Sequence, residues 1–248
     1  YLKDTFVHGI FISNEISDIL ALMYADDVSS VSDTAIQLQR QINCIADFCD
    51  TINMSINLAK TKIVVFRNGG PLRQYEKWFY KNKEIEVVSF YKYLGMYMTP
   101  ELSWTMTHEH ASKQAFKAIS CIFQFQRTFG YFDPNNMFKL FDSMVKPILC
   151  YGSEIWGYKF VDKIERVRLK FCRQYCLLPQ QTANVFVYGE CGRLPLCVIY
   201  MTSCIRYWIK IYIWKIRDTL FNVIKCYVFW MVWVEKLGQV LLSNYYSH

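Results

Sequence analysis

The chain has 248 residues, of which 53% are hydrophobic and 20% are charged, so it can bury a large core and is not a disordered protein. This length allows one large domain or two smaller ones. The ten Cys show no Cys-x-x-Cys pair and no zinc-finger spacing, and no signal peptide opens the sequence, so we expect reduced thiols in an intracellular protein.

The charge is distributed unevenly along the chain. The net charge is +7, but residues 1–60 contain three basic residues against eight acids, which leaves 25 basic against 13 acidic residues in the remainder. An acidic N-terminal segment followed by a basic remainder suits a metal site beside a surface that binds a polyanion. An ordinary solvated basic surface is the simpler alternative.

Residues 19–31 read as two strands joined by a tight turn, with Asp26 and Asp27 at its tip. Asp suits a turn because its side chain bonds the backbone two residues further on. Two adjacent carboxylates are also suitable ligands for Mg²⁺, which prefers hard oxygen ligands. For this short segment alone, a turn with solvated acids is the simpler interpretation.

A helix is predicted after residues 32–34, which offer capping side chains. Its apolar stripe should lie against a sheet, and comprises Leu38, Ile42, Ile45, Cys49 and Ile52. Further strands are predicted at residues 62–66, as a hairpin over 78–88, and as one strand at 93–98, where Gly95 permits a bulge or a close backbone approach. We therefore expect an α+β layer up to residue 98.

From Pro100 onward the apolar spacing is helical. Helices are predicted over residues 104–125, from the Asp133 cap toward Pro147, over 161–175, and from Pro195 to about 237, with a loop or short turn at 151–157. The apolar stretch 219–234 is interrupted by Asn222 and Lys225. It is therefore better read as a buried or partner-facing helix than as a membrane span.

The order of these motifs resembles the palm of reverse transcriptases, most closely those of non-LTR (LINE-type) retrotransposons. The tetrapeptide Tyr24, Ala25, Asp26, Asp27 is followed by a helix, by residues 57–62 leading into a strand, and by residues 91–95. Residues 145–157 and 188–196 resemble the region after the thumb in the same elements. A group II intron maturase shares the tetrapeptide, but residues 91–95 and 151–156 favour the LINE-type elements.

The resemblance covers roughly residues 1–210. It implies a partial polymerase palm over residues 1–98, made of an antiparallel sheet with one covering helix. An all-α thumb-like and C-terminal helical domain would follow over residues 99–248. It further implies that the complete enzyme uses Mg²⁺, an RNA template, a DNA primer and dNTP in two-metal nucleotidyl transfer.

The resemblance also implies roles for catalytic residues. Asp26 would match one of the two main metal-binding aspartates, and Asp27 would support metal binding. Lys60 would lie near the triphosphate and protonate the leaving pyrophosphate. For Lys60, a solvated charge before a strand is an equally good interpretation.

The nucleic-acid-binding residues implied by the resemblance lie at two places in the palm. Tyr24 would lie on the palm floor near the primer end. Tyr93, Leu94 and Gly95 would match the primer grip, which positions the 3′ end. Tyr93 and Leu94 also alternate like any half-buried strand, so a purely structural role is the alternative.

The family places another essential Asp on an earlier palm strand, and this sequence begins too late to contain it. Asp4 and Asp18 lack the flanking apolar pattern of that strand. We therefore expect the isolated chain to be inactive as an RNA-directed DNA polymerase. Two alternatives stay open, a non-catalytic nucleic-acid-binding module and a decayed transposon-derived protein. No membrane partner is expected, and the oligomeric state is left open.

Overall fold

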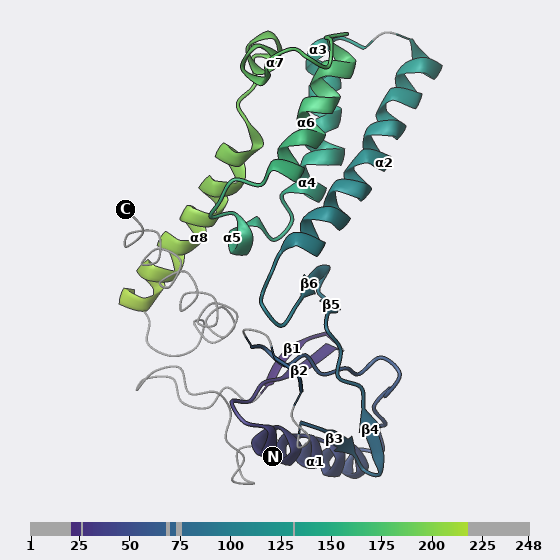
Figure 1. Ribbon diagram of the computed structural model, residues 1–248, viewed down its shortest axis with the longest axis vertical. Helices are drawn as coiled ribbons and strands as arrows, with labels where there is room; N and C mark the ends of the chain where they lie inside the picture. Colours follow the sequence, from purple (N-terminus) through teal and green to yellow (C-terminus); the bar gives the residue numbers. More distant parts are fainter. Residues whose placement is uncertain (1–20, 26, 68–69, 73–75, 131, 218–248) are drawn as a thin grey trace. The chain divides into compact units, whose positions relative to one another are not determined.

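The computed structural model describes residues 21–25, 27–67, 70–72, 76–130 and 132–217 (Figure 1). The chain divides into two compact units. The sheet unit comprises Tyr1–Tyr93, Met98–Leu102 and Ile211–His248, and the helical unit comprises Leu94–Tyr97 and Ser103–Lys210. The predicted α+β class is confirmed in its general form, since helices are combined with small antiparallel sheets. The predicted helix over residues 219–234 lies outside the described residues.

Three hairpins form the sheets. The first pairs β1 (Ala21–Tyr24) with β2 (Asp27–Ser30), as the sequence predicts. The second pairs β3 (Trp78–Tyr80) with β4 (Lys83–Ile85) around a two-residue turn. The third pairs β5 (Tyr91–Tyr93) with β6 (Met96–Met98). Each hairpin is a separate two-stranded sheet within the described ranges.

Two strand predictions were wrong. The single strand expected over residues 93–98 is a hairpin instead, because Leu94 and Gly95 both adopt positive φ, 45° and 82°, and reverse the chain. Positive φ at both central residues is the hallmark of a tight type I′ hairpin turn. The strand expected at residues 62–66 is reduced to one parallel bridge between Ile63 and Val87, although Ile63 and Val65 still pack in the core.

The helix predicted after residues 32–34 is confirmed as α1 (Ala35–Thr51). Thr34 caps it, since its hydroxyl accepts from the Gln37 N–H at 3.2 Å. The apolar stripe packs in the sheet unit as predicted, except that Ile52 lies past the last turn and is exposed. The core beneath α1 comprises Ile42, Ala46, Ile63, Trp78, Tyr80 and Ile85.

Polar contacts fix β3 against α1. The indole N–H of Trp78 donates to the Ala35 carbonyl at 2.9 Å. The Gln39 amide donates to the Phe79 carbonyl at 2.7 Å and accepts from the Phe79 N–H at 2.8 Å. Gln39 therefore satisfies both backbone groups of Phe79, as a neighbouring strand would do.

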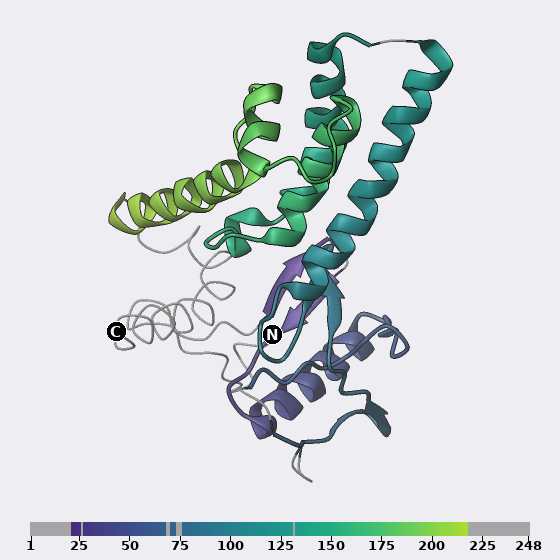
Figure 2. The ribbon, with the colours of Figure 1, turned by 45° about the horizontal axis from the view of Figure 1, so that its top comes forward.

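The helical unit is built on α2 (Thr105–Phe129), which runs beside α4 and α6 in both ribbon views (Figure 1 and Figure 2). After α2 come α3 (Pro134–Leu140), the π-helix η2 (Phe141–Val145), α4 (Lys146–Leu149), α5 (Ser153–Trp156), α6 (Asp162–Tyr175), α7 (Asn184–Cys191) and α8 (Leu196–Arg217). The Asp133 cap is confirmed, because its carboxylate accepts from the Asn135 N–H at 3.0 Å. Helix α7 was not predicted.

The third predicted helix extends past Pro147 rather than stopping before it. The wider turn of η2 ends two residues before Pro147, and such a turn accommodates a residue that lacks a backbone N–H. The core of the helical unit gathers around Phe171, which contacts the rings of Phe123, Phe138 and Phe141 at centroid distances of 5.6, 5.8 and 4.7 Å. These helices therefore share one aromatic core.

Helix α8 contains one 18-residue window, Leu196–Ile213, that is long and apolar enough to cross a membrane by length and composition. A helix of a water-soluble protein passes the same test, so this window alone does not indicate a membrane protein.

The N-terminus of α8 is held by the buried Glu165 carboxylate, which accepts from the Leu196 N–H at 3.0 Å and the Cys197 N–H at 3.2 Å.

Candidate nucleic-acid interface

The tip of the β1–β2 hairpin carries the predicted metal-binding pair. Tyr24 lies opposite Asp27 in the register, so only two positions of the chain separate the paired strands at this tip. Ala25 adopts a φ of 53°. Tyr24 and Asp27 are both exposed, and Asp26 lies outside the described residues. The backbone of the tip thus matches the tight turn that the sequence predicts.

Gln41 of α1 anchors the base of this hairpin. Its side chain is fully buried, its amide donates to the Val31 carbonyl at 2.9 Å, and the Ser30 hydroxyl donates to its Oε1. A buried amide is stabilising only where its hydrogen bonds are made. Sequence analysis missed Gln41. A polar residue directly before Ile42 of the apolar stripe is the signal that indicates a buried, hydrogen-bonded side chain here.

The described residues do not supply a complete metal site. Among them, no group of three His, Cys, Asp or Glu side chains lies close enough to hold a metal ion. Asp27 is therefore at most one ligand of a site. Mg²⁺ binds through one or two carboxylates together with waters and substrate phosphates, so Asp27 and its neighbour Asp26 fit only part of the ligand set.

Lys60 lies in an exposed turn rather than at the start of a strand. Its backbone N–H donates to the Asn57 carbonyl at 3.1 Å, and its carbonyl accepts from the Tyr91 hydroxyl at 3.3 Å. Its side chain is exposed. In the described part of the chain, no hydrogen bond or ion pair joins Lys60 to Asp27, so the structure leaves these two predicted catalytic residues unlinked.

The predicted primer-grip residues lie in the β5–β6 hairpin, with Tyr93 half-buried and Leu94 and Gly95 exposed in its turn. Within the helical unit, the Tyr151 hydroxyl donates to the Leu94 carbonyl at 2.8 Å. A Cβ placed on Gly95 would lie 3.0 Å from Cε1 of Tyr151. The predicted close backbone approach at Gly95 is therefore confirmed, and Tyr151 is the residue that makes it.

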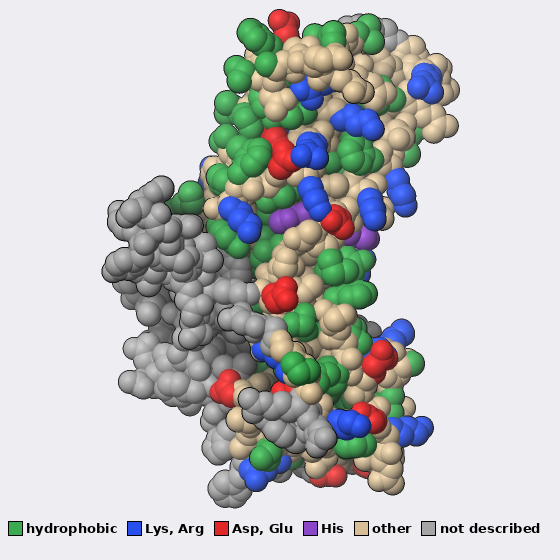
Figure 3. All heavy atoms as spheres, in the orientation of Figure 1, with side chains coloured by type: hydrophobic (Ala, Val, Ile, Leu, Met, Phe, Trp, Pro, Cys, Tyr) green, Lys and Arg blue, Asp and Glu red, His purple; other side chains and the backbone are tan. Residues whose placement is uncertain are grey.

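A basic face covers α2 and α6 of the helical unit (Figure 3). It is formed by exposed cationic side chains at Lys113, Lys117, Lys163, Arg166 and Lys170. Its two acids, Glu109 and Asp162, are paired with Lys163 and Arg166. The hydrogen bond from Lys163 lowers the pKa of Glu109, so this acid stays ionised and neutralised.

The remaining cations of the face are available to an anion. Lys170 lies over the Phe116 ring, 4.7 Å from its centroid, which holds the ammonium at the junction of the two helices. Lys113 and Lys117 form no ion pair with any described residue, and they lie one helical turn apart. Neighbouring cations at this spacing attract the phosphates of a nucleic acid through counterion release.

Comparisons with known proteins give one informative match. An uncharacterized transposon-derived protein of Caenorhabditis elegans is 26% identical over 148 residues, which cover 60% of this chain and 52% of that protein. The chain therefore spans about half the length of this relative. No protein-family profile matches the chain, and no solved structure matches it significantly. The match supports a transposon origin and nothing more specific.

Proposed function

We propose that this chain derives from the reverse transcriptase of a non-LTR retrotransposon, and that on its own it binds nucleic acid without synthesising DNA. The observation that carries the proposal is the β1–β2 hairpin, whose register pairs Tyr24 with Asp27 at its tip. The transposon-derived relative supports the origin. The basic face on α2 and α6 supports the binding.

In the complete enzyme, Asp26 and Asp27 would hold Mg²⁺, which would stabilise the charge of the reacting phosphates. Tyr24 and the Tyr93–Gly95 segment would position the primer on its RNA template, and Lys60 would face the incoming dNTP. The sheet unit would then be part of a palm, and the helical unit would be thumb-like. Each of these roles belongs to the proposal and requires its own test.

The isolated chain should not polymerise, because catalysis of nucleotidyl transfer requires a cluster of carboxylates, and among the described residues no three His, Cys, Asp or Glu side chains lie together. Primer extension by residues 1–248 on an RNA template with Mg²⁺ and dNTP tests this statement. We expect no extended product. Robust cDNA synthesis would show that the carboxylate set is complete and would refute the non-catalytic assignment.

The origin is tested separately in a complete element that contains this sequence. There, Asp26→Ala should abolish cDNA synthesis, and Asp33→Ala should not, since Asp33 lies outside the hairpin. Synthesis by the Asp26→Ala variant would remove the metal assignment. A decayed, transposon-derived protein is the second candidate, and the relative's description favours it. Loss of both nucleic-acid binding and synthesis would select this candidate.

Binding itself is measured by fluorescence anisotropy with labelled RNA at low salt. Lys113→Ala combined with Lys117→Ala should weaken binding. It should also reduce the slope of log affinity against log salt by roughly 2, about one per phosphate contact. A control with the same change of charge is Lys77→Ala combined with Lys83→Ala at the second hairpin, whose cations are also exposed and of which Lys77 pairs with Glu84 at 3.9 Å. Equal losses for both pairs would mean that charge, rather than the basic face, determines binding.

A further inference from the structure

We propose that one row of exposed side chains on α2, together with the aromatic groove at its end, binds a single strand of nucleic acid through its unpaired bases. This inference rests on the proposed function and deepens it, because it names the class of nucleic acid. The row and the groove both lie in the helical unit. The row supplies cations at one end and aromatic rings at the other.

The row takes every fourth residue of α2. Its members are Lys113, Lys117, Cys121, Phe125 and Phe129, and all five are exposed. Residues four apart form a continuous ridge that turns about 40° around the helix axis at each step, because a helix has 3.6 residues per turn. At 1.5 Å per residue this ridge is about 24 Å long, enough for several nucleotides. The ridge therefore leads from two ammonium groups to two phenyl rings while turning about 160° around α2, a path that a flexible single strand can follow.

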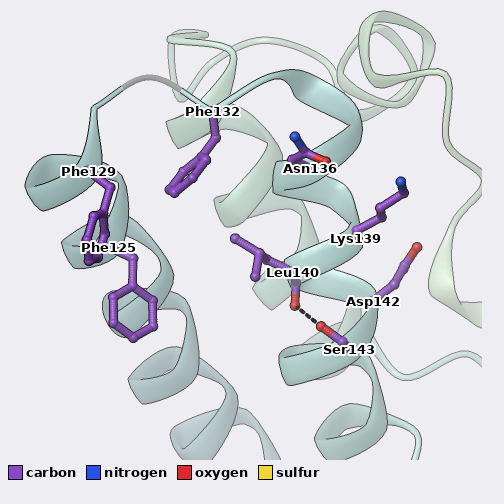
Figure 4. Close-up of a pocket in the computed structure, with 8 residues that line it drawn as sticks. All are labelled: Phe125, Phe129, Phe132, Asn136, Lys139, Leu140, Asp142 and Ser143. Carbon is purple, nitrogen blue, oxygen red and sulfur yellow. Dashed lines mark hydrogen bonds between the residues drawn. The ribbon is translucent and has the colours of Figure 1, made fainter.

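The aromatic end of the ridge borders a groove between α2 and α3 (Figure 4). The groove has a volume of about 880 Å³ and is lined by Phe125, Phe129, Phe132, Asn136, Lys139, Leu140, Asp142 and Ser143. Figure 4 shows Leu140 and the Phe132 ring directed into the gap between the two helices, while Lys139 and Asp142 point away at its outer side. The floor is therefore apolar and the cation is at the rim.

Exposure of these rings is costly without a ligand. Phe129 is 73% exposed and Phe125 is 45% exposed, and their ring centroids lie 6.4 Å apart with a 45° tilt. Aromatic rings of this kind stack on nucleobases, and the bases offer their faces only when the strand is unpaired. A duplex would present only its phosphates to the lysines. The ridge therefore favours a single strand over a duplex.

A protein helix is the other class of occupant. An amphipathic helix also places its apolar face in an apolar groove, such as the one formed here by three phenyl rings and Leu140, so the charges around the groove decide between the two classes of occupant. The acid in the groove lining, Asp142, is already paired with Arg193 at 2.8 Å and Lys146 at 3.5 Å. Lys139 of the lining and the two lysines of the ridge form no ion pair with a described residue, which suits a polyanion better than a protein helix.

Fluorescence anisotropy with a labelled single-stranded 12-mer, and with the duplex of the same sequence, tests the inference. Phe125→Ser combined with Phe129→Ser should weaken single-strand binding at least about fivefold, the effect of losing one stacked base, and leave duplex binding unchanged. Both side chains are exposed, so the variant should fold, and circular dichroism checks this. The matched control is Phe186→Ser on α7, a ring that is 69% exposed outside the ridge.

The second readout uses Cys121, which lies between the lysines and the phenylalanines and is the one exposed Cys among those described. A bound single strand should slow maleimide modification of Cys121, measured by peptide mass spectrometry. Unchanged single-strand affinity in the phenylalanine variant, or an unprotected Cys121, would overturn the inference. If the native chain binds neither single strand nor duplex, the proposed function itself fails. If the phenylalanine variant only abolishes self-association, the groove is a protein interface and the inference is wrong.

Discussion

The Tyr151 hydroxyl donates to the Leu94 carbonyl at 2.8 Å, and its ring occupies the space beside Gly95. Two segments far apart in the sequence therefore meet at one turn of the helical unit. Gly152 repeats the pattern, because a Cβ placed there would lie 2.5 Å from the Met96 sulfur. The turn between β5 and β6 is held from outside by Tyr151 and Gly152, and it is not simply a loop between strands.

Gly95→Ala should destabilise the chain. The φ of 82° strains any residue with a Cβ, and the new methyl would lie 3.0 Å from the Tyr151 ring. The free energy of unfolding, measured with urea, should fall by about 1–2 kcal/mol. Gly192→Ala is the control, since its φ of 58° is also positive but nothing lies within 4 Å of the added methyl. An equal loss in both variants would mean that backbone strain alone matters and that the Tyr151 contact does not.

The part of the fold that could be predicted from the sequence is the part specified locally. Helix α1 was found because its cap at Thr34 and its apolar stripe lie within a few residues of each other. The β5–β6 turn was missed, since Leu94 at a φ of 45° carries no local signal and Tyr151, which supports the turn, comes 57 residues later. Helix α7 was missed as well.

The candidate site also combines features that are specified locally with features that depend on tertiary packing. The β1–β2 turn follows from adjacent turn-forming residues, so its register was predictable from the sequence. The partners of the site were not, because a hydrogen bond such as that from Gln41 to Val31 depends on how α1 packs on the strand. The α2 ridge was missed for another reason. The groove at its aromatic end forms only where α2 lies beside α3, which the sequence pattern of α2 alone does not indicate.

Gln41→Met should loosen the base of the β1–β2 hairpin. Met has a similar volume but leaves the Val31 carbonyl and the Ser30 hydroxyl without their Gln41 partner, in a place where the side chain is fully buried. We expect the free energy of unfolding to fall by about 1–3 kcal/mol, with faster amide exchange in β1 and β2. Arg40→Met on the exposed side of the same helix should change it by less than about 0.5 kcal/mol. Unchanged amide exchange in the Gln41 variant would show that the hairpin does not depend on this residue.

Acidification should destabilise the helical unit through His108. Burial, with Lys159 and Lys163 nearby, lowers the pKa of His108 from 6.5 to about 4, and the ring packs edge-on against Trp156 with a centroid distance of 4.6 Å. Its Nε2 atom has no hydrogen-bond partner among the described residues. Above pH 6.5 the side chain is neutral in both folded and unfolded states, so it causes no pH dependence there.

Between pH 6.5 and 4 His108 binds a proton in the unfolded chain but not in the folded chain. The free energy of unfolding therefore falls as the pH falls. The total loss should be on the order of 2–3 kcal/mol. Urea unfolding at pH 7.5, 6.5, 5.5 and 4.5 measures it. His108→Leu should flatten the profile over this window even if its stability at pH 7.5 is lower. A native profile that is already flat from pH 6.5 to 4.5 would show that His108 titrates normally.

Alkylation should separate the cysteines by burial. Burial raises the pKa of both Cys176 and Cys191 to about 11, and their sulfurs lie 3.6 Å apart at the ends of α6 and α7. At pH 7.5 their reactive thiolate fraction should be about 300-fold below that of an ordinary thiol. Iodoacetamide should therefore modify the exposed Cys121 first, as read by peptide mass spectrometry. Raising the pH to 9.5 should speed modification of this half-buried pair about 100-fold, because thiolate increases tenfold per pH unit below the pKa. In urea all ten Cys should react alike, and early modification of Cys176 in the folded chain would mean that the ends of α6 and α7 open readily.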